Sequence, residues 1–326
     1  MTNTRRLIAL WGVLVLQILA AIWLWWPRQN GPVTGKAWLH LQPTAVTRIE
    51  LSHRSGNHTK TLVLQKQAGH WALPDADDFP ADVSKVRHLL AALGGLKGTL
   101  PVAVTPNAAR RFRVARDKFE ARVTLDAGRR QLARVYVGNA AGANLVYLRR
   151  ADSHNIEANR LPSWLVSASA SDWRDESELQ LPSDSISKLV LPHVTLVKGK
   201  AGWTAAGTAT ALDKAKATGL VDRIAQLDFL DVVGRKPAKA APPAFTIAVD
   251  TNGKTLTYAF DKVALPPAKA GSSKAKPQPR VGWRLTRSDL PFVFGVSGST
   301  VAKLQDASAK TLAATPPSHG KSGKSV

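Results

Sequence analysis

The chain has 326 residues, and 44% of them are hydrophobic, so it is long enough for one large core or for two cores of ordinary domain size. It contains no cysteine, which excludes disulfide bonds, thiolate metal sites and a cysteine nucleophile. The formal net charge of +22 favours anionic partners such as lipid head groups, envelope polymers or nucleic acid, although a solvated surface rich in arginine would carry the same charge.

The first predicted element is a transmembrane helix within residues 1–28. The stretch Leu7–Trp26 has no charged residue and is long enough to cross a hydrocarbon core of about 30 Å. Trp23, Trp25 and Trp26 lie at its end, and indole rings favour the interface between membrane and water. A cleaved signal peptide is the alternative, but its apolar region is usually about 7–15 residues and ends in small residues. We therefore expect an uncleaved anchor.

The flanking charges predict the orientation of this anchor. Arg5 and Arg6 precede the apolar stretch, and Arg28 follows it. Under the positive-inside rule this modest asymmetry favours a short cytoplasmic end, and long domains are exported largely regardless of their own charge. We expect a single-pass protein of the inner membrane whose C-terminal part is periplasmic.

The rest of the chain reads as two copies of one unit. Leu39–Leu51 returns as Leu179–Leu191 at a constant offset of 140, with five apolar residues in register. Further on, Leu64–Leu73 matches Leu196–Ala205, so that Trp71 aligns with Trp203. The aligned segments that follow are Leu89–Leu96 with Leu220–Leu227, Val123–Val137 with Ile247–Phe260, and Tyr147–Asp152 with Arg284–Asp289.

Each unit is predicted to be a strand hairpin, a strand bearing tryptophan, an amphipathic helix, a meander of three strands and a short helix. Apolar residues at i, i+1, i+4 and i+7 in Leu89–Leu96 give the helix one apolar face. Asn252-Gly253 is a strong hairpin signal within the second meander. Consecutive alternating strands indicate an α+β fold, either as two domains or as one elongated body.

The predicted boundaries follow from this alignment. The first repeat covers residues 36–171, the second repeat covers 176–313, and a small, polar linker occupies 172–185. Trp71 and Trp203 are interpreted as equivalent core residues rather than as a surface for stacking a ligand. Trp173 lies in the linker, where we expect it to seal one unit against the other.

Two low-complexity segments lie in and after the second repeat. Residues 264–280 form a basic insertion, rich in proline and lysine, that breaks the second meander. We expect Lys269, Lys274, Lys276 and Arg280 to contact anionic lipid or envelope polymer, the alternative being a merely solvated loop. Residues 314–326 are predicted to be a disordered basic tail. Aromatic residues are not interleaved with these cations, so nucleic acid is not expected as a partner.

No motif in the sequence predicts catalysis, a cofactor or a metal. The eight histidines are scattered, and their spacing matches no zinc-binding pattern. The acidic clusters Asp75–Asp78 and Asp175–Glu178 lie at turns, where carboxylates ordinarily cap helices. Gly295–Ser299 lacks the second glycine of a nucleophile elbow, and Gly320–Ser325 lacks the first glycine of a phosphate-binding loop.

The sequence resembles a bacterial family known as domain of unknown function 4340. The resemblance rests on the N-terminal anchor, on "VTRIEL", on "GHWALP" followed by the "PADVSKVRHLLAAL" helix, and on "DWRDESELQL" leading into "ISKLVL". It covers most of the chain, while the Lys-rich insertion departs from the pattern. Such proteins are similar to envelope accessories whose genes often lie beside ABC transporters like those of gliding-motility systems, and the resemblance implies no catalytic residues.

The sequence therefore predicts a non-enzymatic accessory protein of a membrane complex, with an ABC transporter system as one candidate. Two other functions stay open: an envelope hydrolase or transferase with an unrecognised site, and a binding module for an anionic envelope ligand. A buried carboxylate or histidine pair in a deep cleft would favour the enzyme, and an apolar surface patch would favour the accessory. Lysines and arginines converging on one concavity would favour the binding module.

Overall fold

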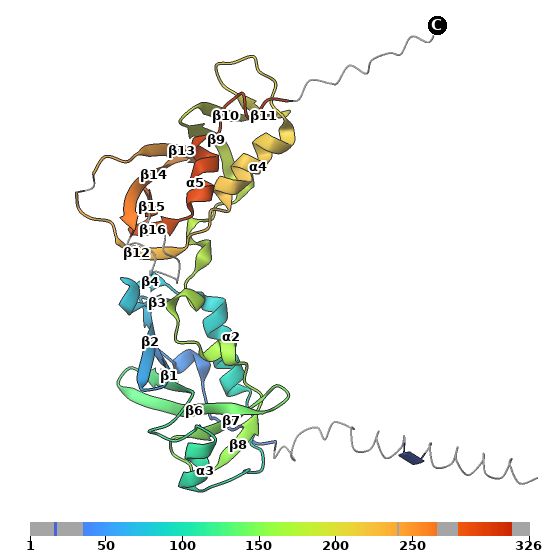
Figure 1. Ribbon diagram of the computed structural model, residues 1–326, viewed down its shortest axis with the longest axis vertical. Coiled ribbons are helices and arrows are strands. Elements are labelled where there is room, and N and C mark those ends of the chain that lie inside the picture. Colours follow the sequence, from blue (N-terminus) through green and yellow to red (C-terminus); the bar gives the residue numbers. More distant parts are fainter. Residues whose placement is uncertain (1–15, 18–34, 240, 266–279, 315–326) are drawn as a thin grey trace, which may run out of the picture. The chain divides into compact units, whose positions relative to one another are not determined.

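A computed structural model describes residues 16–17, 35–239, 241–265 and 280–314 (Figure 1). No helix among these residues is long and apolar enough to cross a membrane. The predicted anchor lies outside the described residues except for Leu16 and Gln17, and so do Lys269, Lys274 and Lys276 of the basic insertion and the tail from residue 315. Of Arg280, only the backbone is described, as the first residue of a strand.

Two eight-stranded sheets, in which the paired strands run antiparallel, make up most of the fold, and a few helices accompany them. The first sheet has the order β4-β3-β2-β1-β5-β6-β7-β8. Its strands are β1 (Arg48–Ser55), β2 (His58–Gln67), β3 (His70–Leu73), β4 (Phe79–Pro80), β5 (Ala121–Ala127), β6 (Arg130–Gly142), β7 (Leu145–Arg150) and β8 (Ile156–Asn159).

The second sheet has the order β11-β10-β9-β13-β14-β15-β16-β12. Its strands are β9 (Ile186–Leu191), β10 (Val194–Gly199), β11 (Gly202–Ala205), β12 (Asp231–Arg235), β13 (Phe245–Thr251), β14 (Lys254–Leu265), β15 (Arg280–Arg287) and β16 (Phe292–Val296). Seven strands of each sheet follow one another in the same order, β3-β2-β1-β5-β6-β7-β8 in the first and β11-β10-β9-β13-β14-β15-β16 in the second. The remaining strand is β4, beside β3, in the first sheet and β12, beside β16, in the second.

The helices preceding the two meanders begin in the same way. In α2 (Val83–Gly94), Oδ1 of Asp82 accepts hydrogen bonds from the backbone N–H of Ser84 at 2.8 Å and of Lys85 at 3.1 Å. In α4 (Lys214–Ala225), Asp213 accepts from the corresponding two N–H groups. The apolar faces predicted for both helices are buried, namely Leu89, Leu90, Leu93 and Leu96, and Leu220, Val221, Ile224 and Leu227.

The remaining helices are short. They are α3 (Pro106–Arg111), α5 (Gly298–Gln305) and the 3-10 turns η1 (Pro43–Ala45), η2 (Pro74–Ala76), η3 (Ser163–Val166), η4 (Ala170–Asp172), η5 (Glu176–Leu179) and η6 (Ser183–Ser185). The short helix predicted at the end of each repeat is thus α5 in the second repeat but only a 3-10 turn in the first.

The meanders have four strands each, not the three that the sequence predicts. The additional strands are β8 and β16. β8 has only four residues, and β16 lacks a polar and apolar alternation, because it reads Phe-Val-Phe-Gly-Val with four of its five residues buried. The predicted hairpin at Asn252-Gly253 is confirmed. Both residues have positive φ (48° and 74°), as a type I′ turn requires, and they join β13 to β14.

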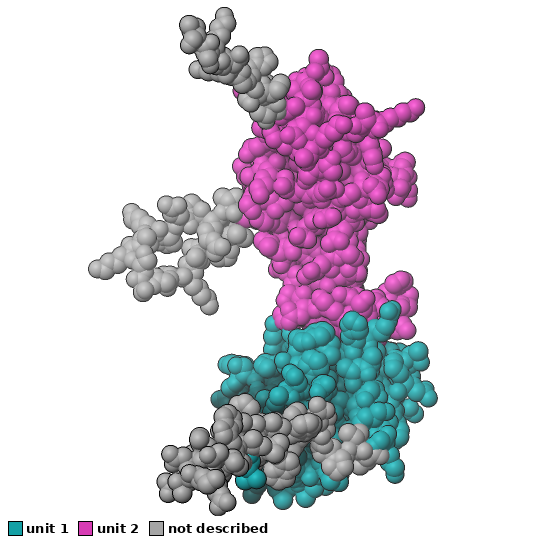
Figure 2. All heavy atoms as spheres, turned by 90° about the vertical axis from the view of Figure 1, so that its right-hand side faces the viewer, with its two compact units in different colours: residues 1–61, 87–168 teal, residues 62–86, 169–326 magenta. Residues whose placement is uncertain are grey.

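The described residues divide into two compact units, 35–61 with 87–168, and 62–86 with 169–239, 241–265 and 280–314 (Figure 2). Residues 62–86 therefore group with the second repeat. Phe79 of β4, which is fully buried, explains part of this grouping because its ring lies 4.8 Å from that of Phe292 and 6.0 Å from that of Phe294. The predicted end of the first repeat at residue 171 and the predicted start of the second at residue 176 stay predictions.

Candidate functional site

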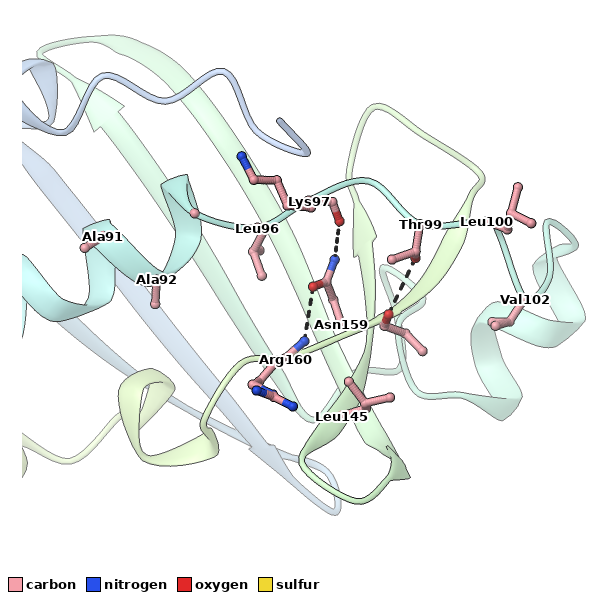
Figure 3. Close-up of a pocket in the computed structure, with 12 residues that line it drawn as sticks. Ala91, Ala92, Leu96, Lys97, Thr99, Leu100, Val102, Leu145, Asn159 and Arg160 are labelled. Atoms are coloured by element: carbon pink, nitrogen blue, oxygen red, sulfur yellow. Dashed lines mark hydrogen bonds between the residues drawn. The ribbon is translucent and has the colours of Figure 1, made fainter. Parts of the chain in front are cut away.

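An open groove of about 480 Å³ lies in the first compact unit, where the chain leaves α2 and passes beside β8 (Figure 3). We call it the apolar groove. Its walls come from the end of α2, from the segment 95–102, from the start of β7 and from the end of β8. The lining residues are Ala91, Ala92, Gly95, Leu96, Lys97, Thr99, Leu100, Val102, Leu145, Ala158, Asn159 and Arg160.

Side-chain hydrogen bonds hold the segment 97–99 against β8. The buried carboxylate of Glu157 accepts a hydrogen bond from the backbone N–H of Thr99 at 2.7 Å and another from its hydroxyl at 3.2 Å. Nδ2 of Asn159 donates to the carbonyl of Lys97 at 2.6 Å, a bond drawn in Figure 3. These bonds satisfy polar groups that would otherwise be unpaired, so the groove has one rigid wall.

The surface of the groove is only slightly more apolar than polar, and it is bordered by positive charge. Leu100 and Val102 are 57% and 51% exposed, and because both line the groove they form a small exposed apolar patch there. Lys97 and Arg160 are the charged residues among the described residues that line the groove, and none of these lining residues is acidic. Exposed apolar area with a polar rim is typical of a surface that another molecule covers.

A second cluster, of titratable groups, surrounds Arg287 in the second compact unit. The guanidinium group is buried and makes two hydrogen bonds to Asp289, at 2.7 and 3.1 Å, and one to the carbonyl of Leu179, at 2.9 Å. It also lies over the ring of Tyr258, 5.8 Å from its centroid. Burial disfavours the charge of Arg287, but the hydrogen bonds that it donates to Asp289 and the nearby Tyr258 outweigh this effect, so the pKa of Arg287 is raised.

The groups around Arg287 are perturbed mainly by burial. Burial raises the pKa of Glu178, and the nearby Asp175 adds to the effect while Arg287 opposes it. Burial likewise raises the pKa of Tyr258, and it lowers that of Lys236, whose amino group donates to the carbonyl of Arg287. Perturbed groups of this kind occur at active sites and also in structural ion-pair networks.

A related but more exposed arrangement occurs in the first sheet, which favours a structural role for the cluster. Arg150 bonds Asp152 at 3.3 Å and donates to the carbonyl of Trp38 at 2.9 Å. Arg150 is paired with Val135 in the first sheet just as Arg287 is paired with Tyr258 in the second. We call each of these an arginine clamp, because each ties a residue of the segment before the first strand of a sheet to the meander of that sheet.

The tryptophans singled out by the sequence are core residues to different degrees. Trp71 is 8% exposed, whereas Trp203 is only partly buried, although it packs against the second core. Both occupy the same register, Trp71 opposite Lys66 and Trp203 opposite Lys198. Trp173 is 2% exposed, and its carbonyl accepts a hydrogen bond from the backbone N–H of Asp82 at 2.8 Å.

One residue of each acidic cluster makes a local hydrogen bond. Asp175 caps η5 by accepting from the backbone N–H of Ser177 at 3.0 Å, and Asp78 accepts from Gln67 at 2.7 Å. Among the described residues, no group of three or more histidines and carboxylates is placed to hold a metal. The sequence reasoning missed the apolar groove, although the alternation of Leu100, Val102 and Val104 was a signal for an extended segment with one exposed apolar face.

The family model described as Domain of unknown function (DUF4340) matches residues 71–245. No curated protein and no solved structure matches the chain. The matched region begins at Trp71, includes the segment that lines the apolar groove, passes through the linker and ends at Phe245 of β13. Because the match covers more than half of the sequence, the chain belongs to the DUF4340 family.

Proposed function

We propose that the protein is a non-enzymatic, single-pass envelope accessory of a membrane complex, such as an ABC transporter system, and that the apolar groove is where it holds its partner. The occupant is an extended segment of an integral membrane protein that carries apolar side chains and an acidic residue. The single observation that carries this proposal is the exposed pair Leu100 and Val102 beside the cations Lys97 and Arg160.

The positive charge at the border of the groove favours a partner segment that carries an acidic residue. With no acidic residue in the lining, Lys97 and Arg160 give the groove a positive border. A segment with an aspartate or glutamate would meet these cations, while its apolar side chains would cover Leu100 and Val102. Covering exposed apolar area stabilises such a complex by about 25 cal/mol per Å² before the cost of association is subtracted.

The location in the envelope is supported by the sequence alone. The apolar stretch Leu7–Trp26, with Arg5 and Arg6 before it, supports an inner-membrane anchor and a periplasmic C-terminal part. The resemblance to envelope accessories encoded near ABC transporters, including those of gliding-motility systems, points in the same direction. The common order of seven strands supports the further proposal that the two repeats arose from one unit.

The non-enzymatic role is supported by what the most perturbed groups contact. Arg287 is held by Asp289 and by the carbonyl of Leu179, and Arg150 makes the same kinds of contact in the first repeat. A feature that recurs at equivalent places in both repeats is better explained by folding than by a single reaction.

The docking proposal is tested with two matched double variants of the full chain. Leu100→Glu with Val102→Glu places negative charge in the apolar groove, while Leu230→Glu with Val233→Glu alters two exposed apolar residues of the second repeat. Both proteins are purified from detergent extracts of their host, and co-purifying membrane proteins are quantified by mass spectrometry. We expect the groove variant to lose one specific partner at least about tenfold, equivalent to 1.4 kcal/mol, and the control to keep it. Equal recovery by both variants contradicts the docking proposal.

The topology is tested separately by fusions after Val326. Alkaline phosphatase should be active there, and a fluorophore that matures only in the cytoplasm should stay dark. The reverse pattern would place the repeats in the cytoplasm and contradict the proposed location.

A further inference from the structure

A second pocket, of about 250 Å³, lies in the same compact unit as the apolar groove and has four basic residues in its lining. We call it the cationic pocket. Arg110, Arg116, Arg149 and His154 line it together with one acidic residue, Asp117. Part of its wall is apolar and consists of Val104, Pro106, Ala109 and Ala115. Four basic side chains from three separate segments therefore converge on one concavity.

Arg149 is the most firmly positioned of these side chains. Its Nε donates to the carbonyl of Val114 at 2.8 Å, and its Nη1 donates to the carbonyls of Arg150 and Ser153 at 3.2 and 3.0 Å. The guanidinium group also lies over the ring of Tyr136, 4.8 Å from its centroid. Burial lowers its pKa, so the charge is incompletely solvated.

Arg149 has no counter-ion within the part of the chain that the structure describes, and its Nη2 makes no hydrogen bond there. A positive charge that is partly removed from water gains more from an anion than a fully hydrated one does. The fixed guanidinium group thus provides a donor that is oriented before any ligand arrives.

A tight turn positions the second cation. Ala115 and Lys118 exchange backbone hydrogen bonds of 2.9 and 3.3 Å, which places Arg116 and Asp117 at the tip. Arg54 of β1 donates to the carbonyl of Asp117 and fixes the turn from outside. Arg116 is exposed and forms no ion pair with another described residue.

The charge balance of the cationic pocket is positive. Asp117 is paired with Arg110 at 2.9 Å, and both side chains are more than half exposed, so this surface pair contributes little to stability. It leaves Arg116 and Arg149 without a partner among the lining residues. Two guanidinium groups that lack a counter-ion among the lining residues favour a ligand that carries two negative charges on one centre.

We propose that the cationic pocket binds the terminal phosphate of a small organic phosphomonoester. A phosphomonoester carries a charge of about −1.5 to −2 at neutral pH and offers three acceptor oxygens, which suits the planar, multiple donors of arginine. Its organic part lies against Val104 and Ala109. The phosphate belongs either to a soluble ester or to the head group of a lipid such as phosphatidic acid. This site is independent of the groove in which we propose that a protein partner docks.

The test is calorimetric titration of the full chain in an uncharged detergent and a buffer free of phosphate. One arm uses glycerol 3-phosphate, and a second uses micelles that contain short-chain phosphatidic acid. Saturable binding in the first arm identifies a soluble ester, binding in the second alone identifies a lipid head group, and either supports the proposal. No saturable binding in both arms up to about 10 mM phosphate, a free energy weaker than roughly −3 kcal/mol, overturns it.

Three variants with different expected signs assign any binding to the cationic pocket. Arg116→Gln should weaken the affinity about tenfold, because one charge-assisted hydrogen bond is lost. Asp117→Asn should strengthen it several-fold, because Arg110 is then free to bind the phosphate. Arg129→Gln, at an exposed position outside the lining, should leave it unchanged. Equal effects of the Arg116 and Arg129 variants, or an unchanged or weaker affinity of the Asp117 variant, contradict the proposal.

Discussion

Two equivalent strands, β6 in the first repeat and β14 in the second, show where the repeats differ. Val137 pairs with Ala121 and Leu148, and Phe260 pairs with Phe245 and Leu285, so the next residues, Gly138 and Asp261, are equivalent. At Gly138 an added Cβ would lie 2.0 Å from the carbonyl oxygen of Phe112. Asp261 has a full side chain at the same place in the second sheet.

This difference arises from the chain between the helix and the fifth strand of each repeat. In the first repeat, residues 95–120 pass over β6, contribute to the apolar groove and the cationic pocket, and contain α3 and the turn at Arg116. In the second, the corresponding connection contains β12, which pairs with β16. The seven strands in common order form the same scaffold in both sheets. The connection 95–120 adds the apolar groove and the cationic pocket to the first of them.

The largest loss of stability is expected on substituting the tryptophans, which occupy the same register in the two sheets. Trp71→Ala should lower the free energy of unfolding by about 3–5 kcal/mol, because it removes a buried indole. Trp203→Ala should cost roughly half as much, since Trp203 is partly exposed. Urea unfolding of the full chain measures both values, and equal losses would show that the two indoles contribute alike.

The next effect concerns the close approach at Gly138. Gly138→Ala should cost about 1–3 kcal/mol or more, because backbone atoms, and not a flexible side chain, must move. Asp261→Ala is the matched control in β14 and should change stability by less than about 0.5 kcal/mol. If the two substitutions cost the same, the connection does not pack on β6 as described.

The arginine clamps should differ in strength. Arg287→Met removes hydrogen bonds made by a buried charge and should cost about 1.5–3 kcal/mol. Arg150→Met should cost less, about 1 kcal/mol, since the side chain of Arg150 is 35% exposed and its partner Asp152 is 77% exposed. Unfolding curves of both variants give the difference, and a larger cost at Arg150 would contradict this ranking.

The smallest effect is a dependence on pH at Glu178, which has no glutamate counterpart in the first repeat. Burial raises its folded pKa above the ordinary value of 4.5, so the folded state binds the proton more tightly than the unfolded state. Its contribution is therefore most favourable below about pH 4.5 and is lost as pH rises through the raised pKa. Glu178→Gln should gain stability relative to the parent protein between about pH 4 and 7. A constant difference across that range would show that Glu178 is not perturbed.

The regular parts of the fold were predictable from the sequence because their patterns are local. The faces of α2 and α4 follow from helical spacing, and the turn at Asn252-Gly253 follows from two residues that accept positive φ. The fourth strand of each meander was not predictable, since β8 has four residues and β16 is almost uniformly apolar. A short apolar run does not reveal its element by periodicity.

The two candidate sites were beyond sequence reasoning for a different reason. The cationic pocket joins Arg110 and Arg116 of the connection 95–120 to Arg149 and His154, and only the packing of that connection against the meander brings these residues together. The family resemblance was predictable from packing motifs and is confirmed. The predicted role of Lys269, Lys274, Lys276 and Arg280 at an anionic surface stays a prediction, because their side chains lie outside the described part of the chain.

The central claim is that the connection of the first repeat, and not its counterpart in the second, contacts the partner. A photo-crosslinking amino acid placed at Val102 or at Val233 tests it most directly, because both positions are about half exposed and lie in equivalent parts of the two repeats. After irradiation of intact cells, position 102 should give a crosslink to an apolar segment of a membrane protein that contains an acidic residue, and position 233 should not. A crosslink from position 233 alone would contradict the claim.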